Sequence, residues 1–307
     1  MSIASDDAVR VTEREYSRVG GRTSAERAIF ARGAESLLAE VRRGRRAEPG
    51  SATPQDDSAK RVQKDEMTSR LVALCFDANE PARLASFWAT ALGWEIEEEP
   101  DGEVCLVPTD RTRFELSFFP VPESKTGRNR LHLDLTTTSV ADQEETVARL
   151  VELGARHIDI GQRPDEGHVV LTDPEGNEFC VIEPNNKFLA GTGRLGSITC
   201  DGTREVGYFW SAALAWPLVW DQDEETAIRA PDGAGPLITW GGPPLPPKVA
   251  KNRLHLDIAP PDHVEQGAEV DRLVSLGATR IDIGQGAVNW VVMADPDGNE
   301  FCVLTPR

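Results

Sequence analysis

The chain has 307 residues and a mass of 33.6 kDa, which is enough for two domains of ordinary size. Hydrophobic residues make up 39% and charged residues 27%, so the chain has the apolar material for packed interiors. Its formal net charge is −18, and the acidic surplus belongs to residues 67–307. A field of that sign repels phosphate backbones and anionic lipids, so we expect neither nucleic acid nor a membrane surface as a partner.

The N-terminal extension, residues 1–66, has no counterpart elsewhere in the chain. Its middle section predicts one helix over about 24–44, because apolar residues form a stripe at helical spacing. The stripe consists of Ile29, Phe30, Leu37, Leu38 and Val41. The segment after it is rich in Pro, Gly, Ser and acidic residues, which predicts a flexible linker. What the stripe packs against stays open: a partner helix, the following domains, or nothing stable.

The region after the linker predicts a regular order of elements. It opens with a short apolar strand at 71–76 and an amphipathic helix at 81–93, and three strands follow. The pattern then restarts with a strand at 130–137, a helix at 141–155 and strands at 156–161, 168–173 and 177–183. Predicted helices end at Leu-Gly pairs such as Leu92-Gly93, where glycine can adopt the left-handed conformation that closes a helix. Each half-domain is therefore β-α-β-β-β.

A long internal repeat organises the chain. The segment NRLHLDL at 129–135 recurs as NRLHLDI at 252–258, an offset of 123 residues, and DPEGNEFCVI recurs as DPDGNEFCVL. The Asp-Pro-x-Gly-Asn segments are predicted structural turns, since Pro presets φ and Gly supplies positive φ. This is a duplicated domain. We predict domains at 67–186 and 194–307, so that the half-domain is used four times in an α+β fold.

Three sequence motifs of the repeat resemble those of a known protein superfamily. FW followed by ALGW on the first helix, NRLHLDL opening the second half and DPEGNEFCVI closing it resemble the vicinal oxygen chelate superfamily, and more narrowly its glyoxalase-like domain. The resemblance covers about residues 69–184 and 194–305 and implies two tandem domains, each of two paired βαβββ units that form a cupped mixed sheet. That superfamily includes glyoxalase I, dioxygenases, epimerases, antibiotic-modifying enzymes and bleomycin-resistance binders, so fold alone names no function.

The resemblance also implies where a metal would bind. The matching positions are Ala73, Glu115, His132 and Cys180 in the first domain and Ser197, Ile238, His255 and Cys302 in the second. A divalent ion usually needs three or four His, Asp or Glu ligands, and each set offers fewer. We therefore predict no cofactor, and we name Glu115 and His132 as the metal ligands if an ion binds.

Two His-x-Asp strands carry the remaining polar chemistry. His132 with Asp134, and His255 with Asp257, project to one face because the strand period is two. A carboxylate beside an imidazole can orient it and raise its pKa for proton transfer. The alternative is a structural network that pairs with Arg130 or Arg253. The candidate catalytic residues are His132, Asp134 and Glu115.

Tryptophans differ between the two copies. Trp240 and Trp290 belong to the second copy, where together with His255 and Asp257 they could line a cup for a flat ligand. Their first-copy equivalents are Ser117 and His168. We predict that polar or metal chemistry, if present, belongs to the first cup, and that an aromatic or otherwise flat apolar ligand prefers the second.

Cysteine usage bears on location. The five cysteines include no CxxC pair, and their odd number leaves one unpaired in any intrachain scheme. The N-terminus lacks an apolar signal core, and the chain has no run of about 18 apolar residues. These features predict a cytoplasmic protein with reduced thiols.

The leading functional hypothesis is a metal-independent small-molecule binding protein of the resistance or sequestration type. The alternatives are a lyase or isomerase acting in the first cup, and an interaction protein that uses the N-terminal helix. The sequence predicts neither the ligand nor the oligomeric state.

Overall fold

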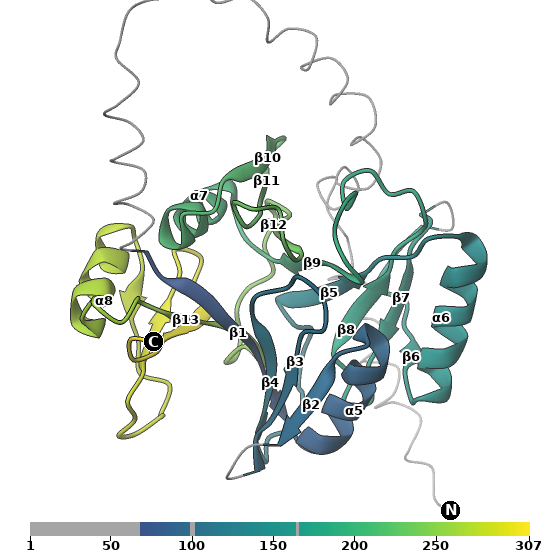
Figure 1. Cartoon of the computed structure of the whole chain (residues 1–307), viewed down its shortest axis with the longest axis horizontal. Helices are drawn as coiled ribbons and strands as arrows, with labels where there is room; N and C mark the ends of the chain where they lie inside the picture. The colour runs from purple at the N-terminus through teal and green to yellow at the C-terminus, as the bar shows by residue number, and fades with distance from the viewer. Residues whose placement is uncertain (1–67, 99–101, 164–165) are drawn as a thin grey trace, which may run out of the picture.

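The computed structural model describes residues 68–98, 102–163 and 166–307 (Figure 1). The helix predicted over about 24–44 and the linker after it lie outside these residues. Among the described residues, none of the helices has the length and apolar composition needed to cross a membrane.

Four βαβββ units follow one another along the chain, as the sequence predicts. The first unit contains β1 (Arg70–Ala78), α5 (Pro81–Leu92), β2 (Glu95–Glu98), β3 (Val104–Val107) and β4 (Glu115–Pro120). The second contains β5 (Leu131–Leu135), α6 (Val140–Glu152), β6 (Arg156–His157), β7 (Val169–Thr172) and β8 (Glu178–Val181). The third contains β9 (Leu195–Cys200), α7 (Arg204–Leu214), β10 (Leu218–Gln222), β11 (Glu225–Ile228) and β12 (Leu237–Trp240). The fourth contains β13 (Leu254–Ala259), α8 (Gln266–Ser275), β14 (Thr279–Arg280), β15 (Val291–Ala294) and β16 (Glu300–Val303).

Local sequence explains the first helix. Pro81 occupies the first turn of α5, where its missing N–H costs no hydrogen bond, and Leu84, Phe87 and Trp88 form the buried stripe. Gly93 ends the helix in the left-handed conformation, with φ of 75°, and its N–H bonds to the Ala89 carbonyl. The predicted Leu-Gly terminus is therefore confirmed in α5.

The two eight-stranded sheets each combine units from both copies. Sheet A has the order β14-β15-β16-β13-β1-β4-β3-β2, and sheet B has the order β10-β11-β12-β9-β5-β8-β7-β6. The first unit therefore joins the fourth through antiparallel β1 and β13, and the second joins the third through antiparallel β5 and β9. Figure 1 shows blue β1 beside yellow-green β13, although they stand at opposite ends of the described chain.

This pairing corrects one expectation. The α+β class and the paired βαβββ units are confirmed, but the two units of one copy do not share a sheet. Each concave sheet face is built from one first-copy unit and one second-copy unit. The predicted division into a first-copy cup and a second-copy cup is wrong for that reason.

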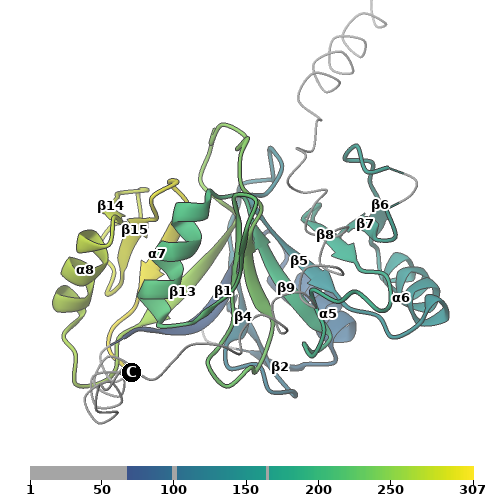
Figure 2. The ribbon, with the colours of Figure 1, turned by 90° about the horizontal axis from the view of Figure 1, so that it is seen from above.

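Within a copy, the two units are held together by their cores. The Trp88 ring on α5 lies 5.1 Å from the Phe179 ring on β8, and its Nε1 donates to the Asp173 carboxylate at 3.2 Å. The second copy repeats this contact with Trp210, Phe301 and Asp295. Figure 2 shows the consequence from above: α5 and α6 lie together on one side of the molecule, and α7 and α8 on the other.

The Asp-Pro-x-Gly-Asn turns serve this packing, as the sequence predicts. Asp173 accepts hydrogen bonds from the backbone of Glu175 and Asn177, and from the Asn177 side chain. Burial nevertheless raises the pKa of Asp173 to about 6, against the opposing effect of these donors and Trp88. The turn therefore buries a carboxylate whose donors are all structural.

Cleavage of the connection between the copies should leave the molecule associated. We expect a protease site placed between Gly191 and Gly193 to give two fragments that co-elute in size-exclusion chromatography, because six residue pairs join β1 to β13 and five join β5 to β9. Fragments that separate as two folded monomers without denaturant would contradict the cross-copy sheets. The same chain cleaved and then unfolded in urea is the control for complete cleavage.

Candidate functional site

The concave face of sheet B carries a buried imidazole and carboxylate at its central seam. His132 pairs with Thr199, and Asp134 pairs with Ser197, across β5 and β9. Paired residues project to the same face, so these four side chains lie together. Half of this group comes from each copy of the repeat.

Hydroxyl groups of the second copy hold the carboxylate. The Ser197 and Thr199 hydroxyls each donate to Asp134 Oδ2 at 2.6 Å, while His132 Nε2 lies 3.5 Å from Oδ1. Asp134 is 1% exposed, so this carboxylate depends on those donors for its solvation. The arrangement fixes the side chain of Asp134 and orients the imidazole toward it.

The pair is ionised near neutral pH. Burial alone would lower the pKa of His132, but the charge and hydrogen bond of Asp134, with the Cys180 thiol, raise it to about 10. Burial likewise opposes ionisation of Asp134, yet His132, Ser197 and Thr199 hold the pKa of this carboxyl below its ordinary value. His132 is therefore an imidazolium that stays charged, since its pKa lies well above neutral.

An apolar wall adjoins this pair on the same face. Cys180, which pairs with Asp134, and Leu237, which pairs with Ser197, pack in one buried cluster with Leu189. The other members are Val170, Ile182, Ile158, Ile160 and Phe188. Phe188 and Leu189 come from the connection between the copies, so that connection packs onto the sheet B face.

Trp220 is the aromatic residue on this face. The strand register places it in one row across sheet B with four residues, each paired with the next: Ala227, Thr239, Thr199 and His132. Its ring contacts Phe188 edge to face at 5.8 Å, and its Nε1 is buried without a hydrogen-bond partner among the described residues. Trp220 is not among the site residues that the sequence predicts. The alternation of side chains in β10 places Trp220 on the face of Leu218 and opposite Val219, but it does not indicate which face is concave.

Trp240 is not a cup residue. It is 1% exposed and packs in the main core on the helix-covered side, where it abuts Gly202. The predicted equivalence of Trp240 with Ser117 is wrong by one residue. Ser197 pairs with Leu237 as Ala73 pairs with Glu115, so Leu237, rather than Ile238, is the equivalent of Glu115. Trp240 is therefore the equivalent of Phe118. A shift of one residue moves a strand side chain to the opposite face. Trp290 is 38% exposed directly before β15, in sheet A.

The concave face of sheet A has a different chemistry. Cys75 pairs with His255, and Ala73 pairs with both Asp257 and Glu115. Cys302 pairs with Asp257 on the other side, and the Cys105 thiol lies 3.3 Å from the Ser117 hydroxyl. Three thiols therefore share this face with Glu115, His255 and Asp257.

The structure groups the predicted site residues by sheet rather than by copy of the repeat. Glu115 stands in sheet A and His132 in sheet B, so these two residues do not form the metal pair that the sequence suggested. Glu115 instead shares a face with His255 and Asp257 of the second copy. His132 with Asp134, and His255 with Asp257, are brought together as predicted, at 3.5 and 3.4 Å.

Two groups of side chains meet a first geometric requirement for a metal ion. Among the described residues, the donor atoms of His132, Asp134 and Cys180 lie within 4.8 Å of one another, as do those of Cys75, His255 and Asp257. The first group is less suited to an ion, because an ion would have to displace a proton from His132, whose pKa is raised, and because Asp134 Oδ2 already accepts two hydroxyl bonds.

The second group fits a soft divalent ion better. His255 Nδ1 and Asp257 Oδ1 are buried without a hydrogen-bond partner among the described residues. The positions that supply hydroxyls to Asp134 in sheet B are occupied here by Ala73 and Cys75. Burial, and then Asp257 and Cys302, raise the pKa of Cys75, so an ion would have to displace the thiol proton.

Comparison with known proteins agrees with this architecture. The glyoxalase-like domain family matches residues 73–182 and 197–304. The chain belongs to the glyoxalase-like domain family. It is a tandem member of the vicinal oxygen chelate superfamily, with the glyoxalase, bleomycin-resistance and dioxygenase fold that the motifs indicated.

Solved structures share this fold at low sequence identity. Glyoxalase I from Zea mays is 14% identical with a TM-score of 0.56, and the alignment covers 79% of this chain and 94% of that one. A putative dioxygenase from Bacillus subtilis is 14% identical with a TM-score of 0.52, covering 78% and 86%. At these identities the likeness shows the fold alone. No curated protein matched the sequence.

The protonation of His132 gives a pH prediction. We expect nitrogen NMR to find its imidazole doubly protonated at about pH 8, because its pKa is about 10 rather than 6.5. Since the folded-state pKa is raised, the stabilisation is complete below pH 6.5 and is lost as the pH rises through about 10. In Asp134→Asn, burial remains without the carboxylate, so His132 should titrate below 6.5. A wild-type titration near 6.5 would refute the ion pair.

The hydroxyl donors give a stability prediction. Ser197→Ala should lower the free energy of unfolding by about 1–3 kcal/mol, because a buried carboxylate loses a charge-assisted bond. Thr239→Val is the matched control: this residue is equally buried, but its hydroxyl donates to the neutral Thr199 hydroxyl at 3.1 Å. The control should lose about 1 kcal/mol in urea denaturation. Equal losses would mean that Asp134 gains nothing from Ser197.

Proposed function

We propose that this protein binds a small organic molecule without a metal, on the concave face of sheet B, and that its role is of the resistance or sequestration type. The observation that carries the proposal is the His132–Asp134 ion pair, which adjoins the apolar cluster of Leu189 and Leu237. Apolar walls with a few convergent polar groups and a shifted pKa are typical of ligand sites.

The imidazolium of His132 indicates the polar part of the ligand. Both ring nitrogens of a protonated histidine are donors, and Nε2 faces Asp134. The other polar neighbour that acts on its pKa is the Cys180 thiol, which is a weak hydrogen-bond acceptor. A ligand oxygen of a carbonyl, carboxylate or sulfonate would therefore be a better acceptor than the thiol.

The aromatic residues indicate the apolar part. Phe188 and Trp220 meet edge to face beside the cluster, which suits a flat ring. The buried Nε1 of Trp220 supplies a second donor for the ligand. Together these features favour a flat molecule with one or two acceptor oxygens.

The raised pKa of His132 argues against acid–base catalysis by His132 and Asp134. A general acid or base works best when its pKa lies near the operating pH, and His132 has a pKa of about 10. The second predicted mechanism, a metal held by Glu115 and His132, fails because the two residues stand in different sheets. Binding without turnover is therefore the better supported function for this face.

A second candidate function belongs to sheet A. A lyase or isomerase there would hold an ion with Cys75, His255 and Asp257, with Glu115 on the same face. The observation that favours it is the buried His255 Nδ1, which has no hydrogen-bond partner among the described residues, whereas an unpartnered Oδ1 is common to Asp257 and Asp134. A bound zinc-like ion would polarise a carbonyl oxygen of the substrate. Elemental analysis of protein purified without chelator separates the candidates, because about one ion per chain would count against a metal-free binder.

The third hypothesis, an interaction protein, concerns the helix predicted over about 24–44, which lies outside the described residues. It would gain if deletion of residues 1–66 removed an association and left ligand binding unchanged. A cytoplasmic location stays a prediction, which is in keeping with five cysteines that are all free thiols.

Anilinonaphthalene sulfonate tests the proposal, since it combines flat rings with an anionic acceptor. We expect the dye to bind the full chain in a fluorescence titration, and Trp220→Ala to weaken it several-fold, because edge or stacking contacts add about 0.5–1.5 kcal/mol to area burial. His132→Gln should weaken it as well, because the sulfonate loses its charged donor.

Trp290→Ala is the matched control, since Trp290 is exposed and belongs to sheet A. Each variant must first unfold as cooperatively in urea as the wild type does, because loosened proteins bind this dye nonspecifically. Equal affinity in Trp220→Ala and wild type would overturn the sheet B site, and loss only in Trp290→Ala would transfer it to sheet A.

A further inference from the structure

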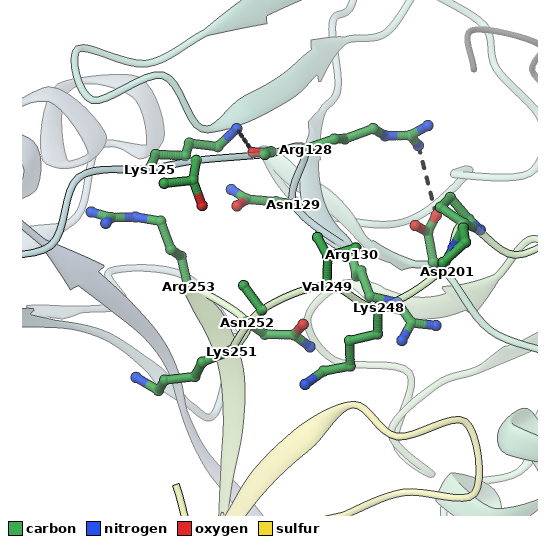
Figure 3. Close-up of a pocket in the computed structure, with 15 residues that line it drawn as sticks. Lys125, Arg128, Asn129, Arg130, Asp201, Lys248, Val249, Lys251, Asn252 and Arg253 are labelled. Carbon is green, nitrogen blue, oxygen red and sulfur yellow. Dashed lines mark hydrogen bonds and ion pairs between the residues drawn. The ribbon is translucent and has the colours of Figure 1, made fainter. Parts of the chain in front are cut away.

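A basic pocket lies where equivalent loops of the two copies meet. Residues 125–130 and 248–253 face each other across a cavity of about 90 Å³, which Asp201, Pro246 and Pro247 also line (Figure 3). Both segments end in the same Asn-Arg pair, Asn129-Arg130 and Asn252-Arg253. The pocket is therefore a product of the duplication, separate from the concave faces described above.

The charge of this pocket opposes that of the chain. Its lining contains six cations and one carboxylate, whereas the whole chain carries −18. The cations are Lys125, Arg128, Arg130, Lys248, Lys251 and Arg253. Such a local concentration of one sign inside an acidic protein attracts small anions.

Carboxylates around the pocket engage five of the six cations. The pairs are Lys125 with Glu178, Arg128 with Asp201, Lys248 with Glu300, Lys251 with Asp77, and Arg253 with Glu175. Lys125 and Lys248 are equivalent, and so are their partners. These pairs fix the two loops, and they leave little excess charge apart from the sixth cation.

Arg130 is that sixth cation. Its residue is 9% exposed, and no described carboxylate lies within ion-pair distance of it. Its Nη1 donates to the Asp297 carbonyl at 3.3 Å, and its Nε is buried without a partner among the described residues. A buried guanidinium with this little compensation is costly unless an anion joins it.

A difference of one methylene, between Glu175 and its counterpart, explains why Arg253 has a carboxylate partner and Arg130 has none among the described residues. Glu175 accepts from the Asn79 and Glu80 backbone at the start of α5 and still reaches Arg253 at 3.1 Å. Its counterpart is Asp297, whose carboxylate accepts from the Thr203 backbone at 2.5 Å. The shorter side chain serves the start of α7, and Arg130 is left with the backbone carbonyl of Asp297 as its acceptor.

We propose that this pocket binds a phosphate group, with Arg130 as its anchor. The planar guanidinium presents paired donors that match phosphate oxygens, and the neighbouring Arg128 and Lys251 side chains, 36% and 38% exposed, supply further N–H donors at the rim. This site is independent of the small-molecule site on sheet B. It adds a second ligand of a different chemical class to the same chain.

The test measures phosphate binding to the full chain by isothermal titration calorimetry in a phosphate-free buffer at constant ionic strength. Inorganic phosphate should bind the wild type, and Arg130→Gln should weaken binding roughly ten- to hundred-fold, the range expected when a charged hydrogen-bond donor is lost. Arg280→Gln is the matched control, because Arg280 is an exposed arginine far from the pocket lining. Wild-type binding of chloride as strong as that of phosphate overturns the proposal, and so does unchanged binding by Arg130→Gln.

Asp297→Glu is the sharper variant, because it removes no cation. The longer side chain should cap α7 and also pair with Arg130, as Glu175 does with Arg253, so phosphate affinity should fall while the unfolding temperature stays or rises. Undiminished phosphate binding in a folded Asp297→Glu protein refutes Arg130 as the anchor. If that variant fails to fold, Arg130→Lys replaces it, and affinity equal to wild type would refute the same point, since lysine lacks the paired donors.

Methyl phosphate distinguishes the two sources of the group. Binding comparable to inorganic phosphate assigns the pocket to phosphate monoesters, and exclusion assigns it to the free ion. Both results support the proposal if they depend on Arg130. Binding of either probe that is the same in Arg130→Gln overturns it.

Discussion

Because β1 pairs with β13 and β5 pairs with β9, backbone hydrogen bonds at two seams tie the copies of the repeat together. Within each copy, a helix tryptophan bonds to the aspartate of a turn in the following unit. Both the sheets and the main buried cluster therefore span the two copies, while these tryptophan-aspartate bonds stay within one copy. Every concave face therefore contains strands from both copies, and its chemistry depends on how the copies differ at the seams.

The two His-x-Asp strands illustrate this dependence. His132 and Asp134 have the same sequence context as His255 and Asp257, yet their environments come from the opposite copy. Ser197 and Thr199 give Asp134 two hydroxyl donors, whereas Ala73 and Cys75 give Asp257 none. Each carboxylate has one buried oxygen, Oδ1, without a hydrogen-bond partner among the described residues, but the other oxygen of Asp134 accepts two hydroxyl bonds. Identical motifs consequently carry different chemistry, which a comparison of the motifs alone does not reveal.

The sequence predicted much of the fold but little of the site. The repeat, the βαβββ order, the helix stripe of α5 and the structural turns all follow from local patterns, so they were predictable. The partner of each strand was not, because NRLHLD opens both second halves and either copy could pair with either first strand. The face of Trp240 was missed for a related reason: LITW in β12 is buried on both faces, so its alternation does not distinguish core from cup. Trp220 was missed because only the strand register places it in the row with His132.

Divergence at the junction between the copies has a sharper effect than divergence elsewhere. Glu175 and Asp297 occupy the same turn position and both serve the start of a helix, so the backbone tolerates either. Only the longer residue also compensates an arginine of the opposite copy. A difference of one methylene thus leaves the fold unchanged and alters the charge balance of a pocket. Symmetric duplication supplies two copies of every buried cation, and the loss of one counter-charge converts a structural arginine into one that can hold an anion. The same reasoning applies at the seams, where Ala73 and Cys75 in place of Ser197 and Thr199 leave the strand pairing intact but remove the hydroxyl donors of a carboxylate. Chemistry in this protein is therefore expected where the copies meet and their side chains differ.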